Sequence, residues 1–298
     1  MNINQLNYVI TIAEEKNISK ASQKLFISQP SLSQSVQLLE KELGIKLFER
    51  KPFSLTDAGQ VFIEWAKNVI SSEKEMKQKL SDIISKDILN LTVGVSPYRC
   101  SYLLPNVILK FKEEHPNCNL KLEEYPTDIL KKLLEEDKID LLIDTPHPDD
   151  FSYTSISVLK ESILLGLPKE WDIECTKTDN YPEVDLSKLK DKPFIMLTQK
   201  QLIGKIGRSL CIQNGFSPKI LLECHNIESL YSFIQKGIGA SFIPELFANF
   251  VKDDNKINCY KIKNSLPERD LAIIYSKNKY LPKAAISFID IFKNEICR

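Results

Sequence analysis

The sequence of 298 residues has only nine glycines, three histidines and two tryptophans, and its charges cancel, with 40 Lys or Arg against 40 Asp or Glu. Zero net charge gives no whole-chain electrostatic pointer toward nucleic acid or a membrane, so any such argument has to be local. Charged residues interrupt every apolar run within a few residues, and the N-terminus lacks a basic segment followed by an apolar one. We therefore expect a cytoplasmic protein with no membrane span and no membrane partner.

Metal-binding and disulfide signatures are also missing. The seven cysteines are odd in number, scattered and never paired as CxxC: Cys100, Cys118, Cys175, Cys211, Cys224, Cys259 and Cys297. The three histidines, His115, His147 and His225, lie far apart, and none has a ligand-like partner three to five residues away. We predict free, mostly buried thiols, no metal site and no cofactor.

The motifs of the common enzyme classes do not occur. The chain contains no Gly-rich phosphate loop, no GxSxG and no paired carboxylates at predicted strand ends. An enzyme needs a nucleophile, a base or a cofactor motif, so we predict no catalytic residues and a binding function instead.

Periodic segments divide the chain near residue 90. Before it every periodic segment is helical, apart from a short hairpin predicted where Phe48 and Phe53 flank a Pro-containing turn. Thr56 and Asp57 form a helix start signal, and a helix without proline then runs to about Asp87. Its apolar residues fall close to a heptad seam and predict a dimerising coiled coil, with a long helix packed on its own domain as the alternative. The seam consists of Phe62, Trp65, Val69, Met76, Leu80 and Ile83.

After residue 89, β-type runs alternate with helical ones. LNLTVGVS, NLKLEEY and KIDLLID are separated by helical segments, and a second set follows from SILLGLP to LAIIYS. This alternation indicates βαβ units on a mostly parallel sheet, arranged as two α/β lobes.

The stretch FISQPSLSQSVQLLEKELG, residues 26–44, has an apolar stripe of Leu32, Val36, Leu39 and Leu43, but its exposed side carries Ser and Gln instead of the usual Lys and Glu. Ser28 can cap this helix, and Pro30 is tolerated in the first turn. The short helix ISKASQKL precedes it, so the pair predicts a helix-turn-helix. Short Ser and Gln side chains would let the second helix lie deep in a major groove and bind base edges.

At this point the sequence resembles the LysR-type transcriptional regulators. The run from NQLNYV to LTDAGQVF carries the ordered series AS..L..SQPSLS..V..LE.ELG..LFER....LT.AG almost without gaps. LLPNVILKFKEEHPN, DLSKLKDKPFI, CIQNGFSP and IESLYSFIQKGIGASFIPE resemble the effector domain of the same family. The resemblance implies an α/β protein with a winged helix-turn-helix, a long dimerisation helix and a two-lobed effector domain of the periplasmic-binding-protein kind.

The expected division has three parts. These are a DNA-binding domain at 1–58, a linker helix at 59–88 and an effector-binding domain at 89–298. Within the last, lobe I covers about 89–161 and 267–298, and lobe II covers about 162–266.

Residue by residue, the resemblance implies a DNA-contacting set. These residues are Ser28, Gln29, Pro30, Ser31, Ser33, Gln34 and Gln37 on the second helix, with Arg50 on the wing. Residues 1–56 carry seven Lys or Arg against five Glu, a net charge of only +2. Because affinity rises with the number of phosphates neutralised, we expect binding to promoter DNA by homodimers or homotetramers that contact several half-sites. RNA polymerase is a further expected partner.

Ligands of open α/β sheets bind beyond the carboxyl ends of the strands. The resemblance implies an effector site between the lobes, lined by strand-end residues that could also be simple caps or turns: Ser96, Pro97, Tyr98, Arg99, Thr127, Thr145, Thr198, Gln199, His225 and Asn226. A helix N-terminus after Ser96 would favour an anion, so we expect a small anionic metabolite.

A redox switch is the alternative interpretation of the effector domain. Peroxide-sensing members of the same family use two cysteines in this region, and Cys211 matches the second of them. The position of the reactive cysteine falls at or near Leu202, so the attacking thiol is missing.

Overall fold

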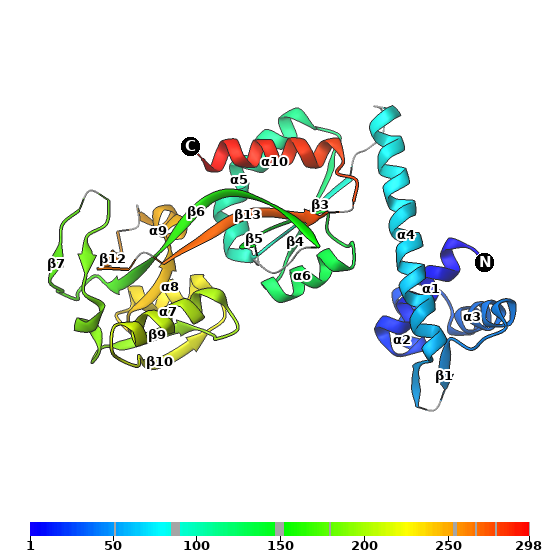
Figure 1. Ribbon diagram of the computed structural model, residues 1–298, viewed down its shortest axis with the longest axis horizontal. Coiled ribbons are helices and arrows are strands. Elements are labelled where there is room, and N and C mark those ends of the chain that lie inside the picture. The colour runs from blue at the N-terminus through cyan, green and yellow to red at the C-terminus, as the bar shows by residue number, and fades with distance from the viewer. Residues whose placement is uncertain are drawn as a thin grey trace. The chain divides into compact units, whose positions relative to one another are not determined.

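The structure is a computed structural model that describes residues 1–50, 52–84, 90–146, 152–178, 180–252, 255–265, 267–277 and 279–297, with Arg50 and Ile84 described by their backbone alone. The chain forms two compact units. The N-terminal unit holds residues 1–89 together with 279–282, and the C-terminal unit holds 90–278 and 283–298. Figure 1 shows the elements of both.

Three short helices begin the N-terminal unit: α1 (Ile3–Glu15), α2 (Ile18–Lys24) and α3 (Gln29–Leu43). Each begins at a polar cap, Asn2, Asn17 or Ser28, whose side chain accepts a hydrogen bond from a backbone N–H of the first turn. Their apolar faces meet in one core, which includes Leu6, Val9, Ile12, Ala21, Leu32, Val36 and Leu39. The predicted helix-turn-helix is therefore confirmed.

The turn between α2 and α3 has an unexpected conformation. Phe26 adopts a φ of +54°, in the left-handed region that disfavours a bulky side chain, and its ring is 95% exposed. The bend places Ile27 partly against the core, and Ser28 then starts α3. Periodicity alone gave no signal for this conformation.

The predicted hairpin is present as β1 (Phe48–Arg50) paired antiparallel with β2 (Phe53–Leu55). The rings of Phe48 and Phe53 stack with centroids 5.4 Å apart. Glu40 of α3 fixes the hairpin, because its carboxylate accepts hydrogen bonds from the backbone N–H groups of Leu47 and Phe48, at 2.7 and 3.2 Å.

The long helix α4 (Asp57–Ile84) starts where predicted, and the Thr56 hydroxyl accepts a hydrogen bond from the Gly59 N–H at 2.9 Å. Gly59 has to be glycine for packing, since a Cβ there would lie 2.1 Å from the Leu47 carbonyl oxygen. Near the other end of α4, the Tyr280 hydroxyl donates to Asp82 Oδ2 at 2.6 Å, so the segment 279–282 packs on this helix.

The C-terminal unit is built on a mixed sheet with the strand order β4-β3-β5-β13-β6-β12-β8-β7. In lobe I, β3 (Asn90–Val95) lies between β4 (Asn119–Glu124) and β5 (Leu141–Asp144), and all three are parallel. In lobe II, β9 (Pro193–Leu197) pairs in parallel with β10 (Lys219–Cys224), while β11 (Ser241–Pro244) pairs with β6.

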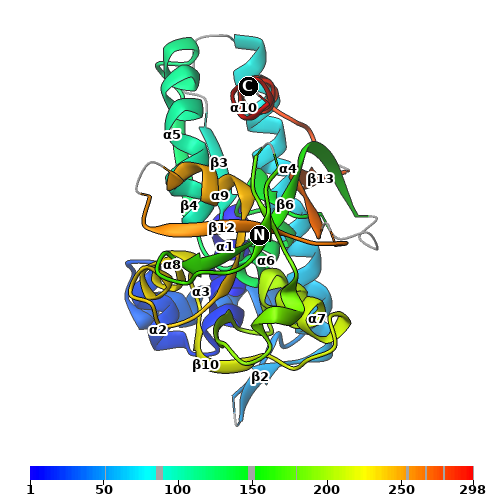
Figure 2. The same cartoon turned by 90° about the vertical axis from the view of Figure 1, so that its left-hand side faces the viewer.

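Two strands run through both lobes. β6 (Tyr153–Pro168) pairs with β13 (Glu268–Ser276) in lobe I and with β11 and β12 (Ile257–Ile262) in lobe II, always antiparallel. Figures 1 and 2 show both strands as the connection between the lobes, and in Figure 2 lobe II faces the viewer.

Helices cover the sheets of each lobe. Lobe I carries α5 (Pro97–Glu114), α6 (Thr127–Glu135) and α10 (Lys283–Ile296), and α5 packs on α10 through the rings of Phe111 and Phe288, 5.4 Å apart. Lobe II carries α7 (Leu202–Gln213), α8 (Ile227–Gln235) and α9 (Glu245–Phe250) around a core that includes Phe194 and Phe242.

The predicted α/β fold with two lobes is confirmed, but parts of it were missed. The prediction of a mostly parallel sheet was wrong, because β6 and β13 cross the molecule antiparallel to their neighbours. The polar first half of β6, β12, α9 and the short strands β7 (Cys175–Thr176) and β8 (Glu183–Val184) gave no periodic signal that we identified.

Candidate functional site

The exposed face of α3 divides into engaged and unengaged side chains. Ser28 and Ser31 are used locally, since their hydroxyls lie 2.7 Å apart and Ser28 also caps the helix. The Gln29 side-chain oxygen accepts a hydrogen bond from the Ser19 hydroxyl of α2 at 3.0 Å. Pro30 is exposed in the first turn.

Ser33, Gln34 and Gln37 form the unengaged part of that face, hereafter the open face of α3. Gln34 and Gln37 are exposed and Ser33 is half-buried, and no hydrogen bond within the described part of the chain involves their side chains. Their donors and acceptors are therefore free for another molecule.

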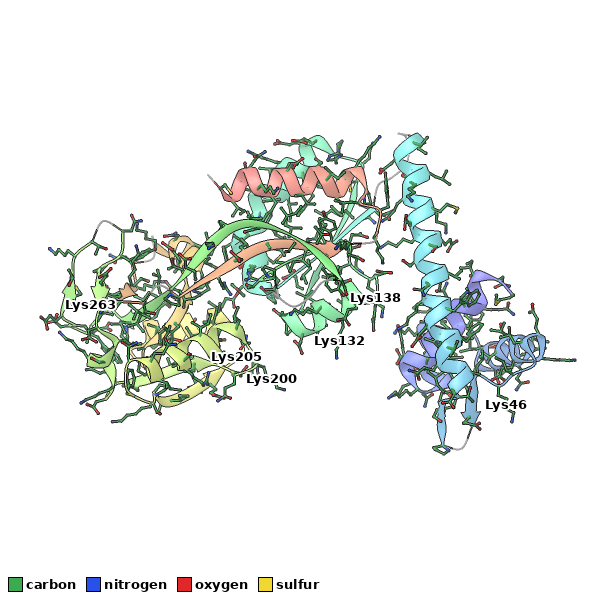
Figure 3. The ribbon with its side chains drawn as sticks, viewed as in Figure 1. Lys46, Lys132, Lys138, Lys200, Lys205 and Lys263 are labelled. Carbon is green, nitrogen blue, oxygen red and sulfur yellow. The ribbon has the colours of Figure 1, made fainter. Side chains whose placement is uncertain are left out.

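Positive charge near α3 is sparse. Lys46 is exposed just before β1, is labelled in Figure 3, and makes no ion pair among the described residues. The side chain of Arg50, predicted to reach DNA from the wing, lies outside the described residues.

In lobe I the predicted effector residues follow β3, β5 and the β4–α6 connection. Ser96 is the N-cap of α5 but forms no capping hydrogen bond, and its buried hydroxyl has no partner among the described residues. Pro97 and Thr127 are exposed, and Tyr98 and Thr145 are half-buried.

Arg99 lies beneath this surface, with 1% of its side chain exposed, and forms an ion pair with Asp144 at the end of β5. It also donates to the Thr145 hydroxyl at 3.3 Å. Burial alone would raise the pKa of Asp144, but the charge of Arg99 and hydrogen bonds from Thr127, Arg99 and the Thr145 N–H outweigh burial and lower that pKa. The pair thus contributes stability at neutral pH, and this contribution is lost as pH falls through the lowered pKa.

In lobe II the predicted residues follow β9 and β10. Thr198 is half-buried and Gln199 is exposed. The start of α7 packs against Thr198, and this close approach requires glycine at position 204, because a Cβ there would lie 2.3 Å from the Thr198 carbonyl oxygen. His225 and Asn226 are exposed, but the Asn226 side chain is used as the N-cap of α8, 2.7 Å from the Ser229 N–H. We call Ser96, together with the exposed and half-buried predicted residues at these strand ends in both lobes, the strand-end site.

Sequence reasoning missed the partners of the buried cations. Asp144 was missed as the partner of Arg99. A second buried ion pair, between Glu161 on β6 and Arg269 on β13, was missed as well. The partners are 45 and 108 residues apart in sequence, so no local pattern points to either pair. The exposed Lys132 of lobe I and Lys200 and Lys205 of lobe II, labelled in Figure 3, were also missed.

The predicted seam of α4 is partly covered within the chain. Phe62 is buried in the core of the N-terminal unit and Val69 packs against that core. Four seam residues are exposed, by 43%, 51%, 48% and 76%: Trp65, Met76, Leu80 and Ile83.

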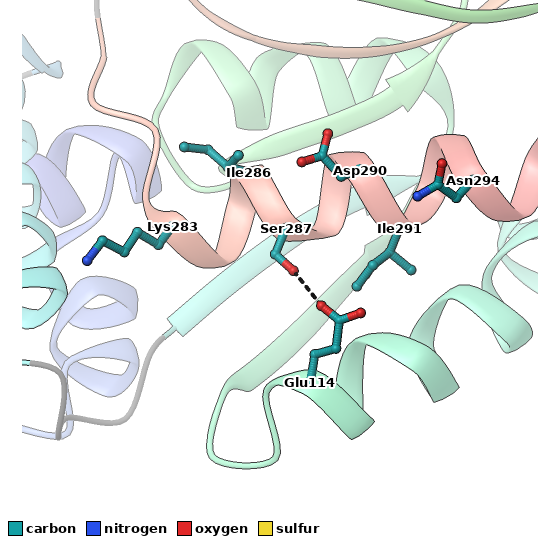
Figure 4. Close-up of a pocket in the computed structure, with 7 residues that line it drawn as sticks. All are labelled: Glu114, Lys283, Ile286, Ser287, Asp290, Ile291 and Asn294. Carbon is teal, nitrogen blue, oxygen red and sulfur yellow. Dashed lines mark hydrogen bonds between the residues drawn. The ribbon is translucent and has the colours of Figure 1, made fainter.

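The described residues form two pockets, of which one lies away from the strand ends and the other reaches Pro146, the residue after Thr145. A shallow groove of about 340 Å³ lies along α10 beside the end of α5, where Ser287 donates to Glu114 at 3.3 Å (Figure 4). A cavity of about 30 Å³ lies under α6, lined in part by Leu134 and Tyr153. The sequence predicted neither.

Both units match known protein families. Residues 3–60 match the bacterial regulatory helix-turn-helix protein family of lysR type, and residues 89–296 match the LysR substrate binding domain. The chain belongs to the LysR family of transcriptional regulators. It is therefore a DNA-binding regulator and not an enzyme, as the sequence predicted.

LysR-type relatives match along nearly the whole chain. The HTH-type transcriptional regulator BsdA of Bacillus subtilis (strain 168) is 30% identical over 98% of this chain and 100% of its own length. A probable RuBisCO transcriptional regulator of Trieres chinensis is 29% identical over 99% of this chain and 96% of its own.

Solved LysR-type structures share the fold. CbnR in complex with its target DNA has a TM-score of 0.64 at 20% identity, covering 99% of this chain and 100% of that one. A full-length OxyR variant from Pseudomonas aeruginosa has a TM-score of 0.67 at 22% identity, covering 98% of this chain and 95% of that one.

The redox alternative finds no support in the geometry of this LysR-type regulator. Cys211 is fully buried in the core of lobe II, and burial raises the pKa of its thiol to about 12. A reactive cysteine needs an exposed thiolate, so Cys211 is a core residue.

Membrane spans and metal clusters are both missing from the described part of the chain. No helix there is long and apolar enough to cross a membrane. Among the same residues, no group of three or more His, Cys, Asp or Glu side chains is arranged to hold a metal ion.

Proposed function

We propose that this LysR-type regulator reads promoter DNA through the open face of α3, responds to a small anionic molecule at the strand-end site, and acts as an oligomer joined through α4. The division into 1–58, 59–88 and 89–298 belongs to this proposal. The observation that carries it is the open face, where three polar side chains near the start of a helix have no partner in the part of the chain that the structure describes.

Base reading rests on side-chain chemistry. Glutamine amides can donate and accept at the edge of an adenine, and a serine hydroxyl can do either. Ser28, Gln29 and Ser31 are used within the protein, so they position α3, and Ser33, Gln34 and Gln37 are left to read bases. Lys46 and Arg50 supply contacts to phosphate or the minor groove. CbnR, which shares the fold, has been solved with its target DNA.

Gln34→Ala should weaken binding to the cognate promoter by about 1 to 3 kcal/mol and leave binding to random DNA nearly unchanged, because only a base contact is lost. Lys46→Ala is the matched control, since loss of a phosphate contact should weaken both equally and reduce the salt dependence. Equilibrium binding of both variants to both DNAs at two salt concentrations measures this. Equal losses on the two DNAs for Gln34→Ala would contradict base reading.

The anionic class of the effector rests on three features of the strand-end site. The helices α5 and α7, one from each lobe, begin without a side-chain cap, so their first N–H groups are available to an anion. The buried Ser96 hydroxyl has no partner among the described residues and lies at the first of these helix starts. Lys200 and Lys205, which are exposed on either side of the start of α7, add positive charge near the end of β9. By contrast, Arg99 and Arg269 are already paired with carboxylates.

Ser96→Ala should leave stability unchanged, because the hydroxyl makes no internal hydrogen bond among the described residues, but should weaken effector binding by about 3- to 10-fold. Thermal-shift screening of the whole protein against small carboxylates, amino acids and inorganic anions would supply the ligand. Ser241→Ala is the control, since that hydroxyl is also buried and unpartnered in the described structure but belongs to β11, outside the strand-end site. A ligand that binds Ser96→Ala as tightly as the unmodified protein does not occupy this site.

Self-association rests on the exposed apolar residues of α4. Trp65, Met76, Leu80 and Ile83 fall in one stripe of the helix, and three of them lie beyond the part that packs on the N-terminal core. A second α4 would cover this stripe. An oligomer also compensates for the weak DNA affinity expected from the low positive charge of a single DNA-binding domain, because it binds several half-sites together.

Met76→Asp should shift the protein toward monomer, since an unpaired carboxylate would be buried in the seam. Lys67→Asp also introduces a carboxylate on α4, but on the opposite face, and should keep the oligomer. Sedimentation analysis of both folded variants measures their oligomeric state. An unchanged mass for Met76→Asp would show that α4 pairs through another face or not at all.

A further inference from the structure

Glu161 and Arg269 are register partners on the two strands that connect the lobes. Their side chains are only 1% and 5% exposed, and Arg269 Nε donates to Glu161 Oε2 at 2.7 Å. A buried ion pair is costly to desolvate, so it is retained only where further hydrogen bonds satisfy both groups.

Those further bonds lead into different lobes. Arg269 Nη2 donates to the Tyr98 hydroxyl of α5, in lobe I, at 2.9 Å. Glu161 Oε1 accepts a hydrogen bond from the Leu246 N–H of α9, in lobe II, at 3.3 Å. The result is a continuous series of three hydrogen bonds from one lobe to the other, which we call the bridging network: Tyr98, Arg269, Glu161 and the Leu246 N–H.

Aromatic contacts run beside the bridging network. The Tyr102 ring lies 5.9 Å from Tyr98 on the same helix, and 6.1 and 6.0 Å from Phe247 and Phe250 of α9. The helices α5 and α9 therefore also touch directly. The Tyr102 hydroxyl is buried without a partner among the described residues, so only its ring serves the contact.

This arrangement restrains movement between the lobes. Hydrogen bonds weaken steeply when their distance or angle changes, and a rotation of one lobe would leave a buried charge without its partners. Tyr98 is itself part of the strand-end site, and the guanidinium carbons of Arg99 and Arg269 lie 5.5 and 5.8 Å from its ring centroid. The bridging network thus fixes a site residue as well as the lobe that carries it.

We infer that the bridging network holds the two lobes at one fixed separation, so that Arg269 and Glu161 are positioning residues that set which size of effector the strand-end site accepts. The size limit rests on the proposed effector site, whereas the fixed separation does not. The effector is then selected by its fit between lobes held at that separation.

The fixed separation is tested without any ligand. Hydrogen exchange of the whole protein is compared with that of the double variant Glu161→Gln/Arg269→Met, which removes both charges together and leaves no unpaired buried ion. The amides of α9 should exchange at least about tenfold faster in the variant, because α9 loses its hydrogen-bonded link to lobe I and keeps only the aromatic contact, while β3 and β9 stay protected. Unchanged exchange in α9 overturns the inference.

Phe250→Ala provides a second variant that tests the same contact at small risk to folding, because this ring is 59% exposed. It should also speed exchange in α9, whereas Tyr102→Phe, which keeps the ring and removes only the unpartnered hydroxyl, should not. The arrangement would be contradicted if Tyr102→Phe increased the exchange rate of the α9 amides, or if Phe250→Ala left that rate unchanged.

The size limit is tested by thermal shift with a series of carboxylates from acetate to benzenedicarboxylates. The unmodified protein should accept a narrow range of sizes and the double variant a wider one. The same narrow range in both proteins overturns the positioning role of the pair. If no carboxylate binds either protein, the proposed anionic effector fails, and hydrogen exchange still decides the fixed separation.

Discussion

The C-terminal unit depends on four buried charges that must stay paired. Arg99 with Asp144, and Arg269 with Glu161, lie where α5, β5 and the two connecting strands meet. A single buried charge left without its partner costs several kcal/mol, so neither member of a pair can be moved or lost alone without that cost. The same pairs place Tyr98 and Thr145 at the strand-end site.

The N-terminal unit uses its polar groups differently. Caps, the link from Ser19 to Gln29 and the Glu40 carboxylate fix α3 and the wing, and these bonds are local or join neighbouring elements. The side chains that hold α3 in place are thereby distinct from Ser33, Gln34 and Gln37, which make no hydrogen bond among the described residues.

Local patterns in the sequence were sufficient for the helices other than α9, for the wing and for most strands. Apolar periodicity located α3 and α4, whereas the residues of the strand-end site came from the resemblance to the LysR family. The first half of β6 escaped because its residues are polar and only partly buried, and β12 because Asn258 and Lys261 break its pattern. The paired charges escaped for another reason, because residues 45 and 108 positions apart come together only after the strands have crossed. Likewise, the partial cover of Val69 depends on neighbouring elements.

The dependence of the C-terminal unit on paired buried charge can be measured by a double-mutant cycle on Arg99 and Asp144. The free energy of unfolding is determined for the unmodified protein, Arg99→Met, Asp144→Ala and the double variant. Each single variant should lose about 3 to 5 kcal/mol, and the double variant much less than the sum, because no unpaired charge remains. Losses that simply add would contradict this dependence, because the two groups would then stabilise the fold independently.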